Sequence, residues 1–174
     1  MGDIILTGPK HCGKTTAGKA LASLISGSFI DLDEKITQNT GKTPRELYKE
    51  SPVVFQKAEA EALSAIIETY GKKKRVITMG GGIIDNPEAI ALLSLFKKSG
   101  AEIVYLDISA AAAWERISNK ELPPFLQTDN PQETHRVLHK RRASAYRKLA
   151  DIVVNAERKS PQNIAEVIAE ETAG

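Results

Sequence analysis

The chain has 174 residues, of which 41% are apolar and one, Cys12, is a cysteine. This length suits a single domain that buries about two-thirds of the surface of its unfolded chain, and one cysteine excludes an intrachain disulfide. The 24 Lys plus Arg and 22 Asp plus Glu residues are mixed along the chain, which excludes the one-signed surface of a dedicated nucleic-acid-binding protein. The N-terminus has no signal-peptide pattern and no apolar stretch reaches membrane-spanning length, so we expect a cytoplasmic protein without nucleic-acid or membrane partners.

Short apolar segments alternate with longer amphipathic segments along the chain. The apolar segments predict five buried strands, Asp3–Thr7, Phe29–Leu32, Arg75–Met79, Glu102–Leu106 and Asp151–Val154. The amphipathic segments predict helices over Lys14–Ser26, Val53–Tyr70, Pro87–Lys98, Ala110–Ser118, Pro131–Leu149 and Pro161–Glu171. This alternation favours an α/β fold in which a five-stranded parallel sheet has helices on both faces.

Two polar segments interrupt this pattern. Ser118–Asn130 contains two prolines and little periodicity, which is typical of a mobile loop or lid. Lys72–Arg75 reads KKKR between a predicted helix and a predicted strand, and we expect it to be a solvated charged turn.

A phosphate-binding motif lies between the first predicted strand and the helix that follows it. The segment GPKHCGKT, which begins at Gly8, fits the pattern G-x-x-x-x-G-K-[ST]. Gly8 and Gly13 let successive backbone N–H groups turn toward a phosphate at the N-terminus of the helix. Lys14 then bridges the β- and γ-phosphates of a nucleotide, and the Thr15 hydroxyl binds Mg²⁺. The loop alone does not choose between a GTPase, an ATPase and a kinase, and together with the rest of the chain it predicts ATP and Mg²⁺ as cofactors.

The rest of the chain favours a small-molecule kinase over a signalling GTPase. The guanine-reading pattern N-K-x-D is approached only at Asn119–Leu122, which lacks the required acid, and no D-x-x-G element is present. We therefore predict a P-loop NTPase-like three-layer sandwich, with residues 1–174 forming a single kinase domain.

Two acids, Asp31 and Asp33, follow the second predicted strand. A spacing of two places both carboxylates on one face at the carboxyl end of a parallel strand, where α/β sheets bind ligands. Phosphoryl transfer needs an acid near the metal and another near the acceptor hydroxyl. The structural alternative is that Asp33 only caps a helix that starts at Glu34.

Three consecutive glycines, Gly80 to Gly82, follow the third predicted strand. Glycine costs chain entropy, so three together indicate a place where the backbone must stay bare. Approach of a ligand to the N–H groups explains them better than a sharp turn does.

These motifs together resemble the shikimate kinase family. The matching segments keep the family's order over nearly the whole chain: GPKHCGKTT, IDLDEKI, VITMGGG, PPFL, RASAY and NAERKSP. The resemblance implies a kinase that transfers the γ-phosphate of ATP to the 3-hydroxyl of shikimate. It also implies a helical substrate-binding region over about residues 33–62 and a lid over about residues 118–130.

The resemblance also implies roles for individual residues. Lys14 and Asp33 would be catalytic, and Thr15 and Asp31 would lie at the metal. Nucleotide contacts would come from Gly8, Gly13, Lys14, Thr15, Thr16, the adenine-stacking Arg116 and Arg158 of the adenine loop. Acceptor contacts would come from Asp33, Gln56, Glu59, Gly80, Gly81, Gly82 and Arg142. Glu59 would orient a basic neighbour, and Arg142 would hold the carboxylate of the substrate.

Three positions depart from the family pattern. Gln56 stands where the family has an arginine for the substrate carboxylate, and an amide cannot form a charged bidentate contact. Pro123 stands where the lid arginine is expected, and His11 replaces a usual glycine of the phosphate loop. Lys57 and Lys120 are candidates to restore the two missing charges.

These departures leave three hypotheses for the function. The first is an active shikimate kinase with an altered carboxylate clamp, and the second is a kinase of another small hydroxylated metabolite. The third is a nucleotide-binding, kinase-like module with little or no catalysis, against which the retention of Lys14, Thr15, Asp31 and Asp33 argues. In the two kinase hypotheses the partner is a small-molecule substrate, and we expect a monomer.

Overall fold

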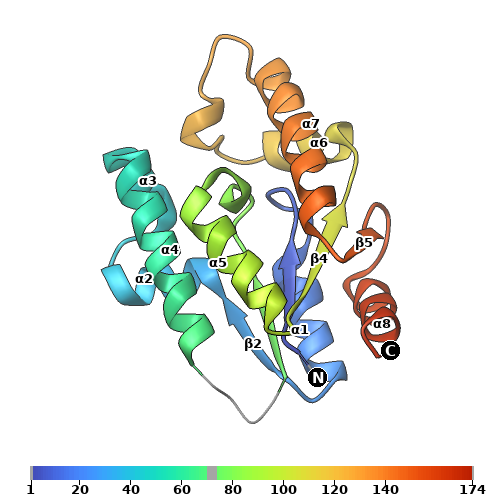
Figure 1. The fold of residues 1–174 in the computed structure, drawn as a ribbon. Helices are drawn as coiled ribbons and strands as arrows, with labels where there is room; N and C mark the ends of the chain where they lie inside the picture. The colour runs from blue at the N-terminus through green and yellow to red at the C-terminus, as the bar shows by residue number, and fades with distance from the viewer. Residues whose placement is uncertain (1, 70–73, 174) are drawn as a thin grey trace.

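The computed structural model describes residues 2–69 and 74–173 (Figure 1). Its centre is a five-stranded sheet in which neighbouring strands are parallel and the order is β2-β3-β1-β4-β5. The strands are β1 (Ile4–Thr7), β2 (Ser28–Asp31), β3 (Arg75–Thr78), β4 (Glu102–Asp107) and β5 (Ile152–Asn155). All five predicted strands are confirmed, with ends displaced by at most one residue. β1, β3 and β4 are buried on both faces, which explains their continuous apolar runs.

Helices cover both faces of the sheet, as the alternation predicts (Figure 1). They are α1 (Lys14–Leu24), α2 (Leu32–Thr40), α3 (Pro44–Glu50), α4 (Pro52–Glu68), α5 (Pro87–Lys98), α6 (Ala110–Ser118), α7 (Pro131–Leu149) and α8 (Pro161–Glu171), with 3-10 turns η1 (Ile83–Asp85) and η2 (Pro124–Leu126). One apolar core lies between the sheet and α2, α4, α5 and α7, and the other between the sheet and α1 and α8. The three-layer α/β prediction is therefore confirmed.

Two short helices, α2 and α3, were not separately predicted within the region 33–62. Side chains cap both of them: Asp31 caps α2, and Thr43 and Glu46 form a capping box at α3. The predicted helix Val53–Tyr70 corresponds to α4 and ends earlier, and Tyr70 lies outside the described residues.

The turn between β2 and α2 corrects the prediction for the two acids. Asp31 is the cap of α2, because its Oδ1 accepts hydrogen bonds from the N–H groups of Asp33 (3.0 Å) and Glu34 (3.2 Å). Asp33 therefore lies in the first turn of α2. The two carboxylates do not share a strand face, since β2 has ended, and the alternative of Asp33 as a cap is wrong as well.

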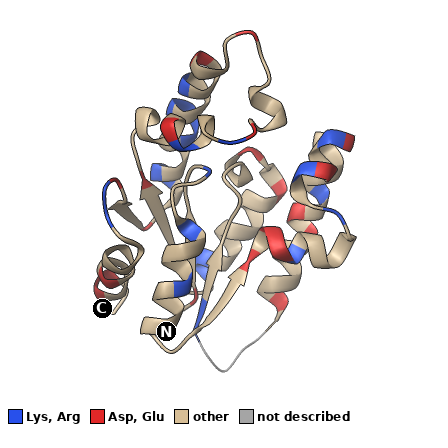
Figure 2. Cartoon of the chain, turned by 180° about the vertical axis from the view of Figure 1, so that it is seen from behind, with Lys and Arg blue, Asp and Glu red and all other residues tan. Residues whose placement is uncertain are grey.

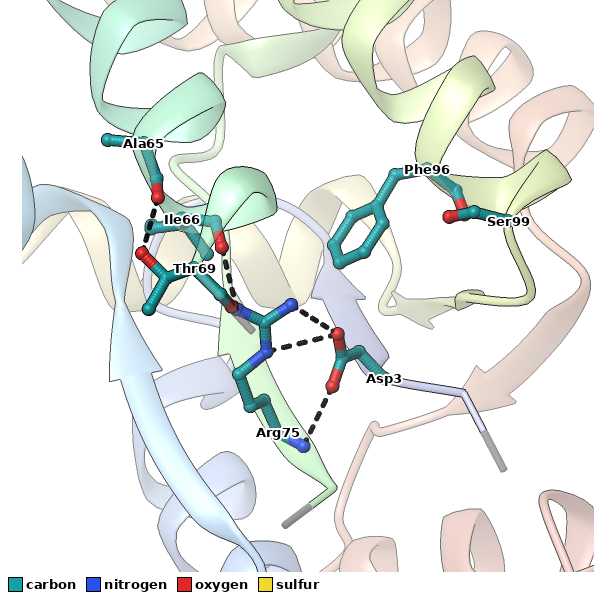
Figure 3. A network of polar contacts seen from close by, with 7 residues as sticks. All are labelled: Asp3, Ala65, Ile66, Thr69, Arg75, Phe96 and Ser99. Carbon is teal, nitrogen blue, oxygen red and sulfur yellow. Dashed lines mark hydrogen bonds and ion pairs between the residues drawn. The ribbon is translucent and has the colours of Figure 1, made fainter. Parts of the chain in front are cut away.

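A buried ion pair ties the start of β3 to the start of β1 (Figure 3). Asp3 Oδ2 lies 2.5 Å from Arg75 Nη2 and 3.0 Å from Nε, and Arg75 Nη1 donates to the carbonyls of Ile66 (2.6 Å) and Thr69. Arg75 is only 7% exposed. The expectation of a solvated turn is thus wrong for Arg75, while Lys72 and Lys73 lie outside the described residues.

The surface carries both signs of charge. Figure 2 shows Lys and Arg interspersed with Asp and Glu over the helices on this side of the molecule. Within residues 2–69 and 74–173, no helix combines the length and the apolar character that crossing a membrane requires.

Candidate active site

The carboxyl ends of β1, β2 and β3 bring three predicted segments together. The phosphate loop follows β1, Asp31 ends β2, and the three glycines come after β3. Thr78 of β3 pairs with Leu6 on one side and with Asp31 on the other, so the ends of all three strands are level. A Cβ added to Gly81 would lie 2.9 Å from the backbone N of Lys10. The glycine segment therefore packs directly against the phosphate loop.

Both fixed glycines of the phosphate loop meet a steric requirement. Gly8 has φ +149°, and a Cβ there would lie 2.7 Å from the carbonyl oxygen of Leu106 and 2.9 Å from Cys12 Sγ. Gly13 has φ +99°, which L side chains rarely adopt. His11, at the position where the family has glycine, also lies in the left-handed region with φ 61°. The wrapped backbone of the loop matches the prediction.

Lys14 is buried under the loop that it follows. Its Nζ donates to the carbonyl oxygens of Gly8 (2.9 Å) and Pro9 (2.7 Å) and lies at the N-terminal end of α1. The Thr16 hydroxyl, in the first turn of α1, donates a hydrogen bond to the carbonyl oxygen of Gly13 (3.0 Å). The lysine charge and the helix N-terminus together favour an anion at this point.

Thr15 and Asp31 form the oxygen pair predicted for a metal. The Thr15 hydroxyl lies 3.1 Å from Asp31 Oδ2, and the Thr78 hydroxyl donates to the same oxygen at 2.8 Å. Hydroxyl and carboxylate oxygens are the ligands that Mg²⁺ prefers. The donor set therefore fits a magnesium ion beside the phosphate loop.

Asp33 points toward the glycine segment. A Cβ on Gly80 would lie 3.3 Å from Asp33 Oδ1. The residue is exposed to solvent, yet desolvation and the nearby Asp31 raise the pKa of its carboxyl group, while Lys14 and Lys10 oppose this shift. A raised pKa suits a group that accepts a proton.

Glu59 also faces Gly80, and among the described residues no basic side chain donates a hydrogen bond to it. It is 1% exposed, its Oε2 accepts a hydrogen bond from Asn86 Nδ2 (2.9 Å), and its Oε1 has no hydrogen-bond partner among the described residues. Burial raises the pKa of Glu59 to about 7. Gln56, one turn earlier on α4, donates instead to the backbone carbonyl of Asp85 (3.2 Å). Gln56 therefore leaves Glu59 Oε1 without a donor.

Arg142 is held by an acid that the sequence did not single out. Its Nε and Nη2 lie 2.8 Å and 2.7 Å from Asp85 Oδ2, and Arg141 Nη1 lies 2.6 Å from Asp85 Oδ1. A Cβ on Gly82 would lie 3.3 Å from Arg142 Nη2. Arg142 therefore borders the glycine segment.

The lid segment, residues 118–130, contains η2 and rests on α3 and α7. Arg45 of α3 contacts Glu121 and donates to the carbonyl of Leu122 (3.2 Å). Phe125 packs edge-on to Tyr48 at 6.1 Å, and Arg142 lies 5.2 Å from its ring centre. Pro123 is buried. Because proline has no ionisable side chain, this position adds no charge to the site.

The two lysines considered as replacements differ in their surroundings. Lys57 Nζ lies 3.9 Å from Glu61 Oε1 and its side chain is 76% exposed, so it does not restore a charge beside Gln56 in this structure.

Lys120 is identified by its effect on the phosphate loop. Burial lowers the pKa of His11 to about 4, with contributions from the positive charges of Lys120, Lys10 and Lys14. Lys120 therefore lies near the phosphate loop.

The two predicted adenine contacts differ in what they touch. Arg116, in the last turn of α6, donates through Nη1 to the carbonyl of His11 (3.2 Å) and thus joins the phosphate loop. Arg158 is exposed in the loop between β5 and α8, with φ 60°. The structure brings Arg116, but not Arg158, against the loop.

Sequence reasoning missed three residues of this site. Besides Asp85, these are Asn86, which contacts Glu59, and Tyr146, whose hydroxyl donates to the carbonyl of Gly81 (3.1 Å). Asn86 precedes Pro87 and caps α5, a role that can be read from the sequence without indicating a contact with Glu59. Tyr146 lies in the RASAY segment, and its position in that segment was the one available signal.

Comparison with known proteins identifies the family. The family model for shikimate kinase matches residues 10–173. The shikimate kinase of Thermodesulfovibrio yellowstonii is 34% identical over 172 residues, which cover 98% of this chain and 95% of the relative. The chain belongs to the shikimate kinase family.

Further members of this family agree in length and fold. The shikimate kinase of Marinomonas sp. is 34% identical over 164 residues, covering 94% of this chain and 87% of the relative. The solved structure of shikimate kinase from Acinetobacter baumannii in complex with shikimate has a TM-score of 0.86 at 28% identity, and covers 100% of this chain and 96% of that one. The chain is thus a P-loop phosphotransferase that acts on an alcohol acceptor with ATP as its substrate.

Proposed function

We propose that this chain transfers the γ-phosphoryl group of ATP to the 3-hydroxyl of shikimate and releases shikimate 3-phosphate and ADP. The observation that carries the proposal is the meeting of Gly81 with the phosphate loop, beside Gly80 and Asp33. An acceptor lying over these glycines has its hydroxyl next to a carboxylate and near the bound phosphates. The shikimate complex of the Acinetobacter baumannii relative supports the choice of acceptor.

The nucleotide half of the site follows from the loop geometry. The backbone of Gly8 to Gly13 binds the β-phosphate, and Lys14 exchanges its contacts with the loop carbonyls for the β- and γ-phosphates. Thr15 and Asp31 hold Mg²⁺, which neutralises the phosphate charge when bound. Thr16 and Arg116 support the loop from either side, and Arg158 lies at the adenine end.

Asp33 acts on the acceptor hydroxyl. The proton moves from the 3-hydroxyl to the Asp33 carboxylate as the hydroxyl oxygen bonds to the γ-phosphorus, and the bond from that phosphorus to the β-γ bridging oxygen breaks. The raised pKa of Asp33 favours this proton transfer. ADP leaves with the electron pair of the broken bond.

The remaining residues position the acceptor. Gly80, Gly81 and Gly82 line it, Glu59 and Gln56 lie beneath it, and Arg142 faces its carboxylate. Lys120, which lies near His11, supplies the positive charge that Pro123 cannot supply from the lid. We place all of these parts in a single domain, residues 1–174, with the acceptor region at about 33–62, and we propose a cytoplasmic monomer.

The test is release of ADP, measured by a coupled assay, with shikimate and with a panel of small polyols and hydroxy acids. We expect turnover with shikimate, and phosphorus–proton NMR should place the phosphate on the 3-hydroxyl. Lys14→Ala should abolish turnover and ATP binding and serves as the control for contaminating kinases. Turnover of another metabolite alone would reassign the acceptor, an outcome that the neutral Gln56 makes worth testing. No turnover with any acceptor, despite ATP binding, would leave a nucleotide-binding module.

A further inference from the structure

The acceptor side of the site contains a carboxylate to which the proposed reaction assigns no role. Asp85 belongs to η1, directly after the glycine segment. Both of its oxygens are paired with arginines: Oδ2 with Nε and Nη2 of Arg142, and Oδ1 with Nη1 of Arg141. The side chains of Asp85 and Arg142 are 23% and 19% exposed. This pair is therefore a largely enclosed contact.

Asp85 carries its negative charge at neutral pH. Burial alone would raise the pKa of this carboxyl group, but the hydrogen bonds and charges of Arg141 and Arg142 hold it below its ordinary value. The single negative charge of Asp85 is therefore shared between Arg141 and Arg142 before any acceptor binds. Since Gln56 is neutral, the two arginines and Asp85 together contribute a net charge of only one positive unit.

The contact also uses the edge of Arg142 that suits a carboxylate best. A guanidinium grips a carboxylate most strongly through two parallel N–H groups, and the Nε and Nη2 groups of Arg142 already converge on Asp85. Arg142 Nη2 also faces Gly82, where the acceptor is proposed to lie. An anionic acceptor must therefore share Arg142 with Asp85 or displace Asp85.

We infer that Asp85 is a specificity-determining residue that competes with the acceptor carboxylate for Arg142 and so shifts the preference of the site toward hydroxylated acceptors of low charge. This inference rests on the proposed function, because it takes the acceptor to lie between Asp33 and Arg142. It predicts that the carboxylate of shikimate contributes little to binding, and this prediction does not depend on the rate of phosphoryl transfer.

The experiment compares shikimate with its methyl ester, which keeps the hydroxyls and removes the charge. Asp85→Asn should lower the KM for shikimate by about fivefold or more, the scale of a charge-assisted over a neutral hydrogen bond. The KM for the ester should stay within about twofold, since no anion competes for Arg142. Asp107→Asn is the matched control, because Asp107 pairs with Arg147 at 2.6 Å in another part of the chain. It should change neither KM.

Other outcomes overturn the inference. A higher KM for shikimate in Asp85→Asn, with the ester unaffected, would mean that Asp85 orients Arg142 for the acceptor. An unchanged KM for shikimate would mean that Asp85 neither competes with the acceptor nor orients Arg142. If the variant does not fold, the wild-type protein decides: we expect its KM values for shikimate and the ester to agree within about tenfold, and a preference for shikimate above about a hundredfold would contradict competition.

Failure of the proposed function has a different signature. In that case the wild-type protein phosphorylates neither compound, and calorimetry with shikimate alone then tests the clamp. Tighter binding of shikimate to Asp85→Asn than to wild type supports competition, and equal or weaker binding overturns it.

Discussion

Asp33 and Glu59 face the same backbone position from two different helices. A Cβ on Gly80 would come within 3.3 Å of Asp33 Oδ1 and within 3.4 Å of Glu59 Oε1. The charge of Asp33 adds to the burial that raises the pKa of Glu59 to about 7. Two carboxylates so close to one another favour a state in which one of them keeps its proton. Burial favours Glu59 as that carboxylate at pH values below its pKa of about 7.

Replacing Glu59 with glutamine should change how stability depends on pH. The pKa of Glu59 rises from 4.5 to about 7 on folding, so the native state binds a proton that the unfolded chain has lost, and the free energy of unfolding falls as pH rises through this window. At about 1.4 kcal/mol per pKa unit, the loss amounts to about 3 kcal/mol by pH 8. Glu59→Gln should remove this decline, and thermal unfolding between pH 4 and 8 measures it.

The control for this prediction is Glu61→Gln on the same helix, since the Glu61 side chain is 66% exposed. Its melting temperature should follow the wild-type profile at every pH. If Glu59→Gln also runs parallel to wild type, Glu59 is ionised in the native protein and its free oxygen binds water.

Asp33→Asn should lower turnover far more than it lowers ATP affinity. The amide keeps the size of the side chain but cannot take the proton of the acceptor, and loss of such a base lowers rates by about a hundredfold or more. The measurements are kcat from ADP release and the ATP dissociation constant from calorimetry. Glu34→Gln, the exposed next residue of α2, is the control. Equal losses in rate and affinity would assign Asp33 to the nucleotide or to folding.

Gln56→Arg should improve the use of shikimate. The new guanidinium would lie beside the unpartnered Oε1 of Glu59 and would add a cation for the acceptor carboxylate. Since a charge-assisted hydrogen bond exceeds a neutral one by about 1 kcal/mol, the KM for shikimate should fall about fivefold. Lys57→Arg, exposed on the same helix, should have no effect. No gain in Gln56→Arg, together with robust wild-type turnover of another metabolite, would identify a different acceptor.

Arg75→Ala should destabilise the protein strongly. The change leaves Asp3 without its cation, and the carbonyls of Ile66 and Thr69 lose a donor (Figure 3). Breaking a buried pair on one side costs about 3–5 kcal/mol, which urea unfolding can measure. Arg136→Ala, which breaks an exposed pair with Glu133, should have little effect. A loss below about 1 kcal/mol in Arg75→Ala would show that solvent or neighbouring groups replace the pair.

The layout of the sheet could be predicted because its strands are buried. β1, β3 and β4 each contain a central apolar run that is buried, and the longer helices begin at recognisable caps such as Asn86 and Ser160. The short helices α2 and α3 also have capping residues, but their seven to nine residues are too few for a clear apolar period. The burial of Arg75 could not be predicted from the KKKR segment, because its partner Asp3 is 72 positions away in the sequence.

The candidate site was predictable where one local segment forms it. The phosphate loop needs only consecutive residues, so Gly8, Gly13 and Lys14 could be identified from their spacing alone. The contacts around Arg142 join η1, α4 and α7, which approach each other only in the folded chain. No spacing indicated Asp85, and the lost partner of Glu59 became visible only once Gln56 was seen bonded to another carbonyl.

The strand order β2-β3-β1 places β3 between the strand that leads into the phosphate loop and the strand that leads into Asp31. Gly80 to Gly82, at the end of that middle strand, therefore form the boundary between the ATP half and the acceptor half of the site. Gln56 and Asp85 both lie on the acceptor side of this boundary. A substitution on that side can alter which alcohol is phosphorylated and leave the fixed glycines, Lys14 and Thr15 of the phosphate loop untouched.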